Sequence, residues 1–272
     1  MDQMAKHAVS VLMGCLLLLT SLNDVSADPL TERDWHFNLN AVYSDRTLSG
    51  EIVNHTAITD NAFGNLAATG DSMNIGSSKG LMLALGAQYK RWGLVLNYMP
   101  TSFSGQGWAV VDVGSGAGVT VKTPLSTNID VDMLLANLSY NFIQTPNAVF
   151  GVGIGFGRTD IDLRIIPEVG SAIIYQGDQP FGFLNMHMYN AYKRFLYGFS
   201  INGISATFEG VKVDYSDYTV DLGYRVIDDK VKCDLIGGYR MVNFAIDIEY
   251  GADVVATDVT MEGPFLGVNL SY

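Results

Sequence analysis

Two pairs of aspartates and three histidines are the residues in this sequence best suited to acid–base chemistry. Asp130 with Asp132, and Asp160 with Asp162, have the spacing that puts two carboxylates on one side of an extended chain. Paired carboxylates can serve as general acid and base when a further group shares their site. The histidines beyond the apolar leader are His36, His55 and His187. We assign none of them as the partner of an aspartate pair.

The sequence patterns for metal binding and for phosphate binding are weaker than the aspartate pairs. No Cys/His set has metal-ligand spacing, and Gly114–Gly118 (GSGAG) has neither the lysine nor the following helical pattern of a phosphate-binding loop. Asp247, Glu249, Asp253 and Asp258 could hold a divalent cation or form a solvated acidic rim. The sequence assigns no metal and predicts no cofactor.

The first residues are typical of an export signal. Lys6 precedes an apolar run from Val9 to Leu19, and Val25-Ser26-Ala27 has the small-residue spacing of a signal peptidase site. We predict a cleaved signal peptide at 1–27 and one domain at 28–272. Cys233 is the only cysteine beyond this leader, so that domain can form no internal disulfide.

Composition narrows the class of protein further. The net charge of −12 opposes nucleic-acid binding, which requires a basic surface. No apolar run after the leader is long enough for a transmembrane helix. Yet hydrophobic residues make up 48% of the chain and the mean hydropathy is +0.19.

Apolar and polar residues alternate with the period of a β-strand in about ten segments. These segments are 35–44, 79–90, 92–103, 129–142, 148–165, 181–192, 195–208, 212–226, 231–250 and 263–272. The phase slips between Met241 and Phe244, which we interpret as a β-bulge. Such slips can hide or invent a crossing, so eight or twelve strands are alternatives.

The connections between the segments alternate in length. Those near Lys90-Arg91, Ile143–Asn147, Lys193-Arg194 and Asp228-Asp229 are short. Those expected at 45–78, 105–127, 166–180 and 251–262 are long. Short turns at one end and long loops at the other are typical of closed transmembrane barrels.

The last segment carries the most specific pattern. Leu266, Val268, Leu270 and Tyr272 share one side of an extended chain that ends in an aromatic residue. This resembles the closing strand of bacterial outer-membrane β-barrel proteins, and the architectural resemblance covers nearly all of 28–272 without identifying a closer family. It implies an all-β, up-and-down antiparallel barrel in the outer membrane of a Gram-negative bacterium. It further implies contact with outer-membrane lipid and lipopolysaccharide, and recognition of the last strand by the barrel assembly machinery.

The face opposite the apolar one is expected to line a narrow lumen. Reflection about Asp228-Asp229 puts Asp217 opposite Arg240 and Arg225 diagonal to Asp234, which predicts an ion-pair ladder; simple wetting of these charges by lumen water is the alternative. The predicted lumen network is His187, Asn185, Asp217, Asp221, Arg225, Asp234 and Arg240. Glycines at every second position of 151–157 leave one wall of the lumen without side chains. The space could hold a small solute or receive bulky side chains from elsewhere in the lumen.

Some small outer-membrane barrels are enzymes. The omptin proteases resemble this chain in strand count and use paired aspartates with an Asp/His pair at the external rim, whereas the lipid deacylases pair a histidine with a serine two residues later. The second residue after His187 is Tyr189, and the second after His36 is Asn38. We therefore predict a non-enzymatic structural or surface-interaction protein with no catalytic residues. A narrow porin-like channel for small solutes and a rim-located protease or lipid hydrolase are the alternatives.

Overall fold

The computed structural model describes residues 35–55, 66–69, 74–112, 120–168, 172–208, 211–250 and 253–272. The predicted signal peptide and the Gly114–Gly118 segment lie outside these ranges. Among the described residues, no helix has the length and apolar character needed to span a membrane.

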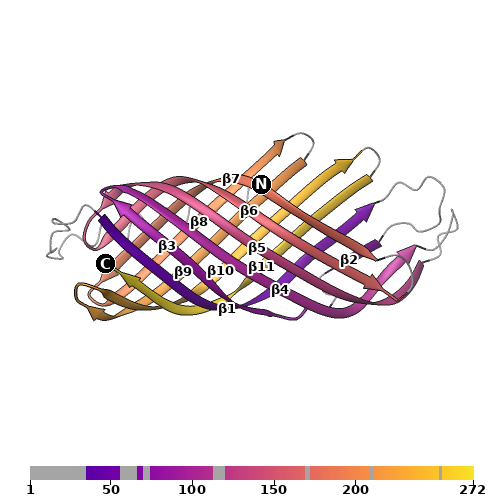
Figure 1. Ribbon diagram of the computed structural model, residues 1–272, viewed down its shortest axis with the longest axis horizontal. Coiled ribbons are helices and arrows are strands. Elements are labelled where there is room, and N and C mark those ends of the chain that lie inside the picture. Colours follow the sequence, from indigo (N-terminus) through magenta and orange to yellow (C-terminus); the bar gives the residue numbers. More distant parts are fainter. Residues whose placement is uncertain are drawn as a thin grey trace. The chain divides into compact units, whose positions relative to one another are not determined.

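Ten long antiparallel strands and one short strand form a sheet that closes on itself (Figure 1). They are β1 (Trp35–His55), β2 (Leu66–Thr69), β3 (Ser78–Tyr89), β4 (Trp92–Asp112), β5 (Thr120–Gln144), β6 (Ala148–Pro167), β7 (Ile173–Tyr192), β8 (Phe195–Phe208), β9 (Val211–Asp228), β10 (Lys232–Tyr250) and β11 (Asp253–Ser271). Strands β1 and β11 pair from Asn38↔Ser271 to His55↔Val254. The predicted antiparallel barrel is confirmed.

The short strand β2 completes the wall where β3 does not reach. Strand β3 pairs with Trp35–Arg46 of β1. Farther along, β2 pairs with Glu51–Asn54 of β1 on one side and with Val110–Val111 of β4 on the other. The expected loop at 45–78 is therefore partly wrong, because β1 continues to His55 and β2 lies within that range.

Most of the long strands are about twice as long as a membrane crossing requires, although β3 has 12 residues and β8 has 14. Strands β6 and β7 each contain 20 residues. At ~3.3 Å per residue and a tilt of ~40°, such a strand rises ~50 Å along the barrel axis, against an apolar band of ~25 Å. The loops expected at 105–127, 166–180 and 251–262 are thus largely wrong, since these residues belong mostly to β4–β7 and β11.

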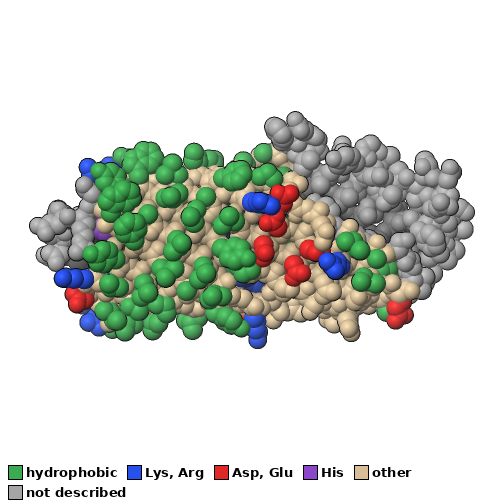
Figure 2. All heavy atoms as spheres, viewed as in Figure 1, with side chains coloured by type: hydrophobic (Ala, Val, Ile, Leu, Met, Phe, Trp, Pro, Cys, Tyr) green, Lys and Arg blue, Asp and Glu red, His purple; other side chains and the backbone are tan. Residues whose placement is uncertain are grey.

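The half of the barrel that holds the short turns, here the turn half, is apolar outside and polar inside. On β5, Leu134, Leu138 and Tyr140 are exposed on the outer face, whereas Asn137 and Asn141 are buried inside. Figure 2 shows apolar side chains covering this half of the surface. A surface of this kind is suited to hydrocarbon rather than water.

The other half, here the extension, has the opposite arrangement. Asp130 and Asp132 of β5 are exposed, whereas Ile129, Val131 and Met133 are buried within the barrel. In Figure 2 acidic and basic side chains gather where the apolar belt ends. The extension is therefore built like a water-soluble barrel.

This reversal explains the apparent slip in β10. The expected bulge between Met241 and Phe244 is wrong: β10 stays in register with β9 from Asp234 to Ile248, and the shift lies between Cys233 and Asp234. Val242 and Phe244 are buried inside, while Tyr239 is exposed outside. The apolar side chains change face because the interior becomes apolar there.

Many aromatic residues are exposed on the outer face. They include Tyr43, Tyr89, Trp92, Tyr98, Tyr140, Phe142, Tyr192, Phe195, Tyr224 and Tyr272. Near the short turns they pair across strands, as in the contact of Trp92 with Tyr140 at 5.1 Å between ring centroids. Rings with a polar edge favour the boundary between hydrocarbon and water.

The position of the belt gives a first prediction. Ile154 is 63% exposed on the outer face of β6 in the turn half. Ile154→Arg should lower the free energy of unfolding in lipid vesicles by ~2–4 kcal/mol, because a cation then sits in hydrocarbon. Denaturant titration measures the change. Gln106→Arg, on the exposed face of the extension, is the matched control, and an equal loss in both variants would contradict the assigned belt.

Candidate functional site in the lumen

The structure brings Asp217 and Arg240 together inside the barrel. Val242 lies opposite Asp217, and Arg240 lies opposite Thr219, so the register differs by two residues from the sequence-based one. The pair meets diagonally: Arg240 Nη2 is 2.7 Å from Asp217 Oδ2, and Nε donates to Oδ1 at 2.9 Å. A planar guanidinium facing a carboxylate in this way is a strong, charge-assisted contact.

Hydrogen bonds extend from this ion pair across the neighbouring strands. Asn202 Nδ2 donates to Asp217 Oδ2 at 2.9 Å, Asn185 Nδ2 donates to Asn202 Oδ1 at 2.7 Å, and Asn185 Oδ1 lies 2.8 Å from His187 Nδ1. Because the carboxylate only accepts, the amides of Asn202 and Asn185 are oriented in turn. The two ring nitrogens of His187 face amide oxygens, with Nε2 lying 2.9 Å from Asn141 Oδ1. This chain of hydrogen-bonded side chains crosses the barrel from Arg240 of β10 to Asn141 of β5.

A second ion pair lies nearer the short turns. Arg225 is directly opposite Asp234, rather than diagonal to it, and Nε donates to Oδ1 at 2.9 Å. Asn269 Nδ2 also donates to Asp234, at 3.3 Å. Within the part of the chain that the structure describes, Asp221 shares this face of β9 but has no hydrogen bond to either group. The predicted ladder is thus two separate groups.

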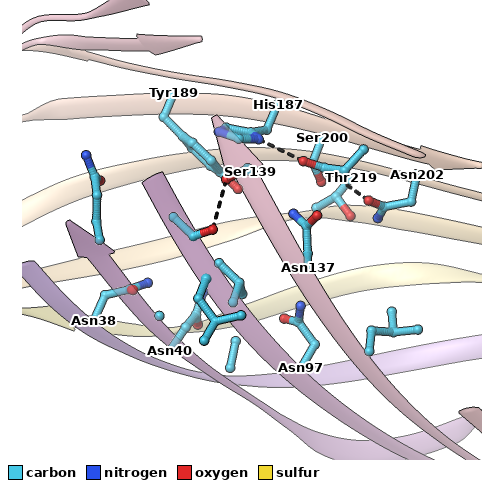
Figure 3. A pocket seen from close by; sticks show the side chains of 18 of the residues that line it. Asn38, Asn40, Asn97, Asn137, Ser139, His187, Tyr189, Ser200, Asn202 and Thr219 are labelled. Atoms are coloured by element: carbon cyan, nitrogen blue, oxygen red, sulfur yellow. Dashed lines mark hydrogen bonds between the residues drawn. The ribbon is translucent and has the colours of Figure 1, made fainter. Parts of the chain in front are cut away.

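A cavity of about 400 Å³ lies in the turn half beside the first network (Figure 3). Its lining combines amide and hydroxyl side chains with apolar ones, and Figure 3 shows Asn97 and Asn137 among the side chains that line it. The lining begins near the short turns with His36 and Gln88. Toward the extension it ends on an apolar floor formed by Val42, Met82, Leu135, Phe183 and Phe265.

Beyond this floor, packed apolar side chains fill the barrel, and we call this cluster the apolar plug. It comprises Met99, Phe103, Leu125, Ile129, Val131, Met133, Leu163, Ile165, Phe181, Tyr215, Val242, Phe244 and Met261. The Phe181 ring lies 4.7 Å from that of Tyr215 and 6.0 Å from that of Phe244, centroid to centroid. The polar lumen therefore does not continue through the described part of the barrel.

The glycine wall of β6 accommodates bulky neighbours. A Cβ at Gly155 would collide with the ring of Phe183, and one at Gly157 would collide with Phe181. Gly151 similarly lies against His187. Of the two alternatives, the structure favours side-chain packing, and it comes from the adjacent strand β7.

The aspartate pairs lie elsewhere, on the outer face of the extension. Arg158 contacts both Asp160 and Asp178 at 3.1 Å, and Arg164 pairs with Asp162 at 3.1 Å. Hydrogen bonds from Arg164 and Gln176 lower the pKa of Asp162, so this carboxyl stays ionised and is a poor general acid.

Neither His36 nor His187 joins the aspartate pairs. His187 lies inside the lumen, and the side chain of His55 lies outside the described residues. The sequence contains one Asp-x-His spacing, Asp34-Trp35-His36. His36 lines the cavity near the short turns, whereas Asp34 is outside the described ranges.

The acidic residues expected near the end of β10 remain mostly untested. The side chains of Asp247, Glu249 and Asp253 lie outside the description, and Asp258 is exposed. Across the described chain, no group of three or more His, Cys, Asp or Glu residues could hold a metal ion.

Some connecting residues are absent from the predicted lumen network, although Asn202 belongs to the face that was expected to line the lumen. Asn202 links the ion pair to Asn185, and the Tyr215 hydroxyl donates to Asp217 at 3.1 Å. Their spacing on the lumen faces of β8 and β9 was the available signal. Arg46 is 4% exposed and donates to Ser44 and Thr101; it was hidden in a presumed loop.

The closing strand has its apolar side on the outer face, as its sequence predicts. Leu266, Leu270 and Tyr272 are exposed, and Val268 is half-buried. Tyr272 and Phe37 exchange backbone hydrogen bonds at 2.9 and 3.0 Å. The proposed reading of this strand by the assembly machinery remains a prediction.

Comparison with known proteins supports the fold. No protein-family description and no curated protein sequence matches this chain. The crystal structure of the outer membrane protease OmpT from Escherichia coli is similar, with a TM-score of 0.51, 14% identity, and coverage of 92% of this chain and 99% of that one. A Pseudomonas aeruginosa FadL homologue gives a TM-score of 0.35 at 8% identity, with 88% and 90% coverage, and AlkL gives 0.33 at 11%, with 92% and 95%.

The chain therefore has the fold of a bacterial outer-membrane β-barrel protein. The closed antiparallel sheet, the apolar outer belt and the similarity to OmpT agree on this class. At 14% identity, the similarity to OmpT is evidence for the fold alone and not for an activity.

The first ion pair gives a second prediction. Arg240→Met should destabilise the barrel by ~3–5 kcal/mol, because it leaves the 1%-exposed carboxylate of Asp217 without its cation. Lys79→Met, at the exposed pair with Asp45, is the control and should cost at most ~1 kcal/mol. Urea unfolding of both variants in the same lipid tests this, and equal stabilities would overturn the importance of the pair.

Proposed function

We propose that this chain is a non-enzymatic outer-membrane barrel with a structural or surface-interaction role. The observation that carries the proposal is the apolar plug. Met99, Phe103 and Met133 are each 1% exposed, and packed apolar side chains leave no path for water or ions.

The extension provides the surface for such a role. Because short turns face the periplasm in this class of barrel, the extension projects outside the cell. Its paired charges, such as Arg158 with Asp160 and Asp178, lie just beyond the apolar belt, at the level of the lipid head groups. We propose that this surface contacts lipopolysaccharide and external partners, and that the last strand guides assembly.

The alternatives have less support. A porin-like channel would use the polar cavity, but that cavity ends on the floor of Met82, Leu135 and Phe183. A rim enzyme would need a base beside its carboxylates. Asp130, Asp132, Asp160 and Asp162 line one hollow on the outer face of the extension, but no described histidine lines it. Asp160 and Asp162 pair with arginines instead.

Planar-bilayer recording tests the closed lumen. The refolded protein should insert, shown by a mobility difference between boiled and unboiled samples, and carry no steady current. The double variant Phe181→Ser and Phe183→Ser should pass measurable current, because it opens the floor and the plug. Steady conductance from the unaltered protein would refute the proposal in favour of a channel.

Cysteine labelling tests the orientation. In a Cys233→Ser background, Ser126→Cys on the extension should react on intact cells with a maleimide that cannot cross the outer membrane. Asp229→Cys, in a short turn, should react only after the cells are opened. The reverse pattern would contradict the proposed external surface.

A further inference from the structure

The cavity in the turn half has features that simple filling of a barrel does not require. Asn40 Oδ1 and Asn137 Oδ1 are buried and have no hydrogen-bond partner, and both residues line the cavity. An unpaired buried acceptor costs ~1–3 kcal/mol. Each oxygen exposes less than 1 Å², so its amide must rotate for a guest with donors to pair with it.

The same cavity also offers a donor. Arg240 Nη1 donates to the Met82 sulfur at 3.7 Å, and a thioether is a weak acceptor. The guest that would satisfy this wall carries hydrogen-bond acceptors as well as donors. Hydroxyl groups provide both from a single atom.

The cavity selects against net charge. Among the described lining residues, only Asp217 and Arg240 carry a formal charge, and they neutralise each other. An ionised guest would lose its hydration without gaining a counter-ion, which is costly. The preferred guest is neutral.

Size and shape complete the description of the guest. A volume of about 400 Å³ lies within the ~300–1,000 Å³ of small-molecule sites. Met82, Leu135 and Phe183 give the cavity an apolar floor, and Tyr189 adds an aromatic ring to its lining. A molecule with hydroxyls around its edge and C–H groups on its faces matches both surfaces.

We propose that the lumen cavity is a binding site, entered from the short-turn end, for a small neutral polyhydroxylated ligand of monosaccharide size. The apolar plug blocks further passage, so the ligand enters and leaves by the same end. This site adds a ligand to the closed barrel and does not depend on the surface role proposed for the extension.

Binding is tested on the full chain in lipid nanodiscs by isothermal titration calorimetry and saturation-transfer NMR. The probes are D-glucose and N-acetyl-D-glucosamine, with D-glucuronate as the charged comparator. At least one neutral sugar should bind saturably, and more tightly than D-glucuronate. No saturable binding of either neutral sugar, or tighter binding of D-glucuronate, would overturn the proposal.

Two variants locate the site. Ala84→Phe adds a ring to the cavity lining and should abolish binding, whereas Ala136→Phe makes the same change on the outer face of β5 and should leave it unchanged. Asn137→Ala, which removes one unpaired acceptor, should weaken binding about threefold to tenfold. If Ala84→Phe fails to fold, Asn137→Ala decides alone, and unchanged affinity in the variant that folds would place binding elsewhere and refute the site.

Discussion

A sheet that lies in hydrocarbon has to pair its last strand with its first, because an unpaired backbone N–H or C=O costs several kcal/mol there. In this protein that pairing runs along nearly the whole of β1 and β11, from the backbone contacts of Phe37 with Tyr272 to His55 with Val254. Closure with ten long strands fixes the width of the interior. Everything else about the lumen follows from how that narrow space is filled.

The same strands meet two environments, and the interior changes accordingly. In the turn half the outer face is apolar, and the interior is stabilised by ion pairs and amide networks around Asp217 and Asp234. In the extension the outer face is polar, so the strands gain stability by burying side chains such as Phe103 and Met133 inside, each contributing ~1.5–3 kcal/mol. The apolar plug is therefore the ordinary core of the part of the barrel that leaves the membrane.

Much of the turn half could be predicted from the sequence, because apolar residues at every second position and aromatic residues near turns report directly on a lipid-facing strand. Leu266 to Tyr272 shows this most clearly. Much of the extension could not be predicted in this way, because its apolar residues occupy the inward face and its outward residues, such as Gln106 and Lys122, look like those of a loop. In β10 the apolar side chains change from the outer to the inner face between Met241 and Phe244, and this change resembled a bulge in the sequence. The ion-pair partners were accessible from same-face spacing, but their register depended on the turn at Asp228-Asp229 and on the shift at Cys233, which alternation alone does not specify.

The central claim is that the barrel has a wet, polar turn half and a dry plug, and methyl NMR of its methionines tests it most directly. In lipid nanodiscs, a water-soluble paramagnetic agent should relax the methyl group of Met82, which lines the cavity. Met99 and Met133, within the plug, should be protected from that agent and also from a lipid-soluble one. Relaxation of Met99 and Met133 by the water-soluble agent to the same degree as Met82 would mean an open, water-filled lumen and would contradict this account.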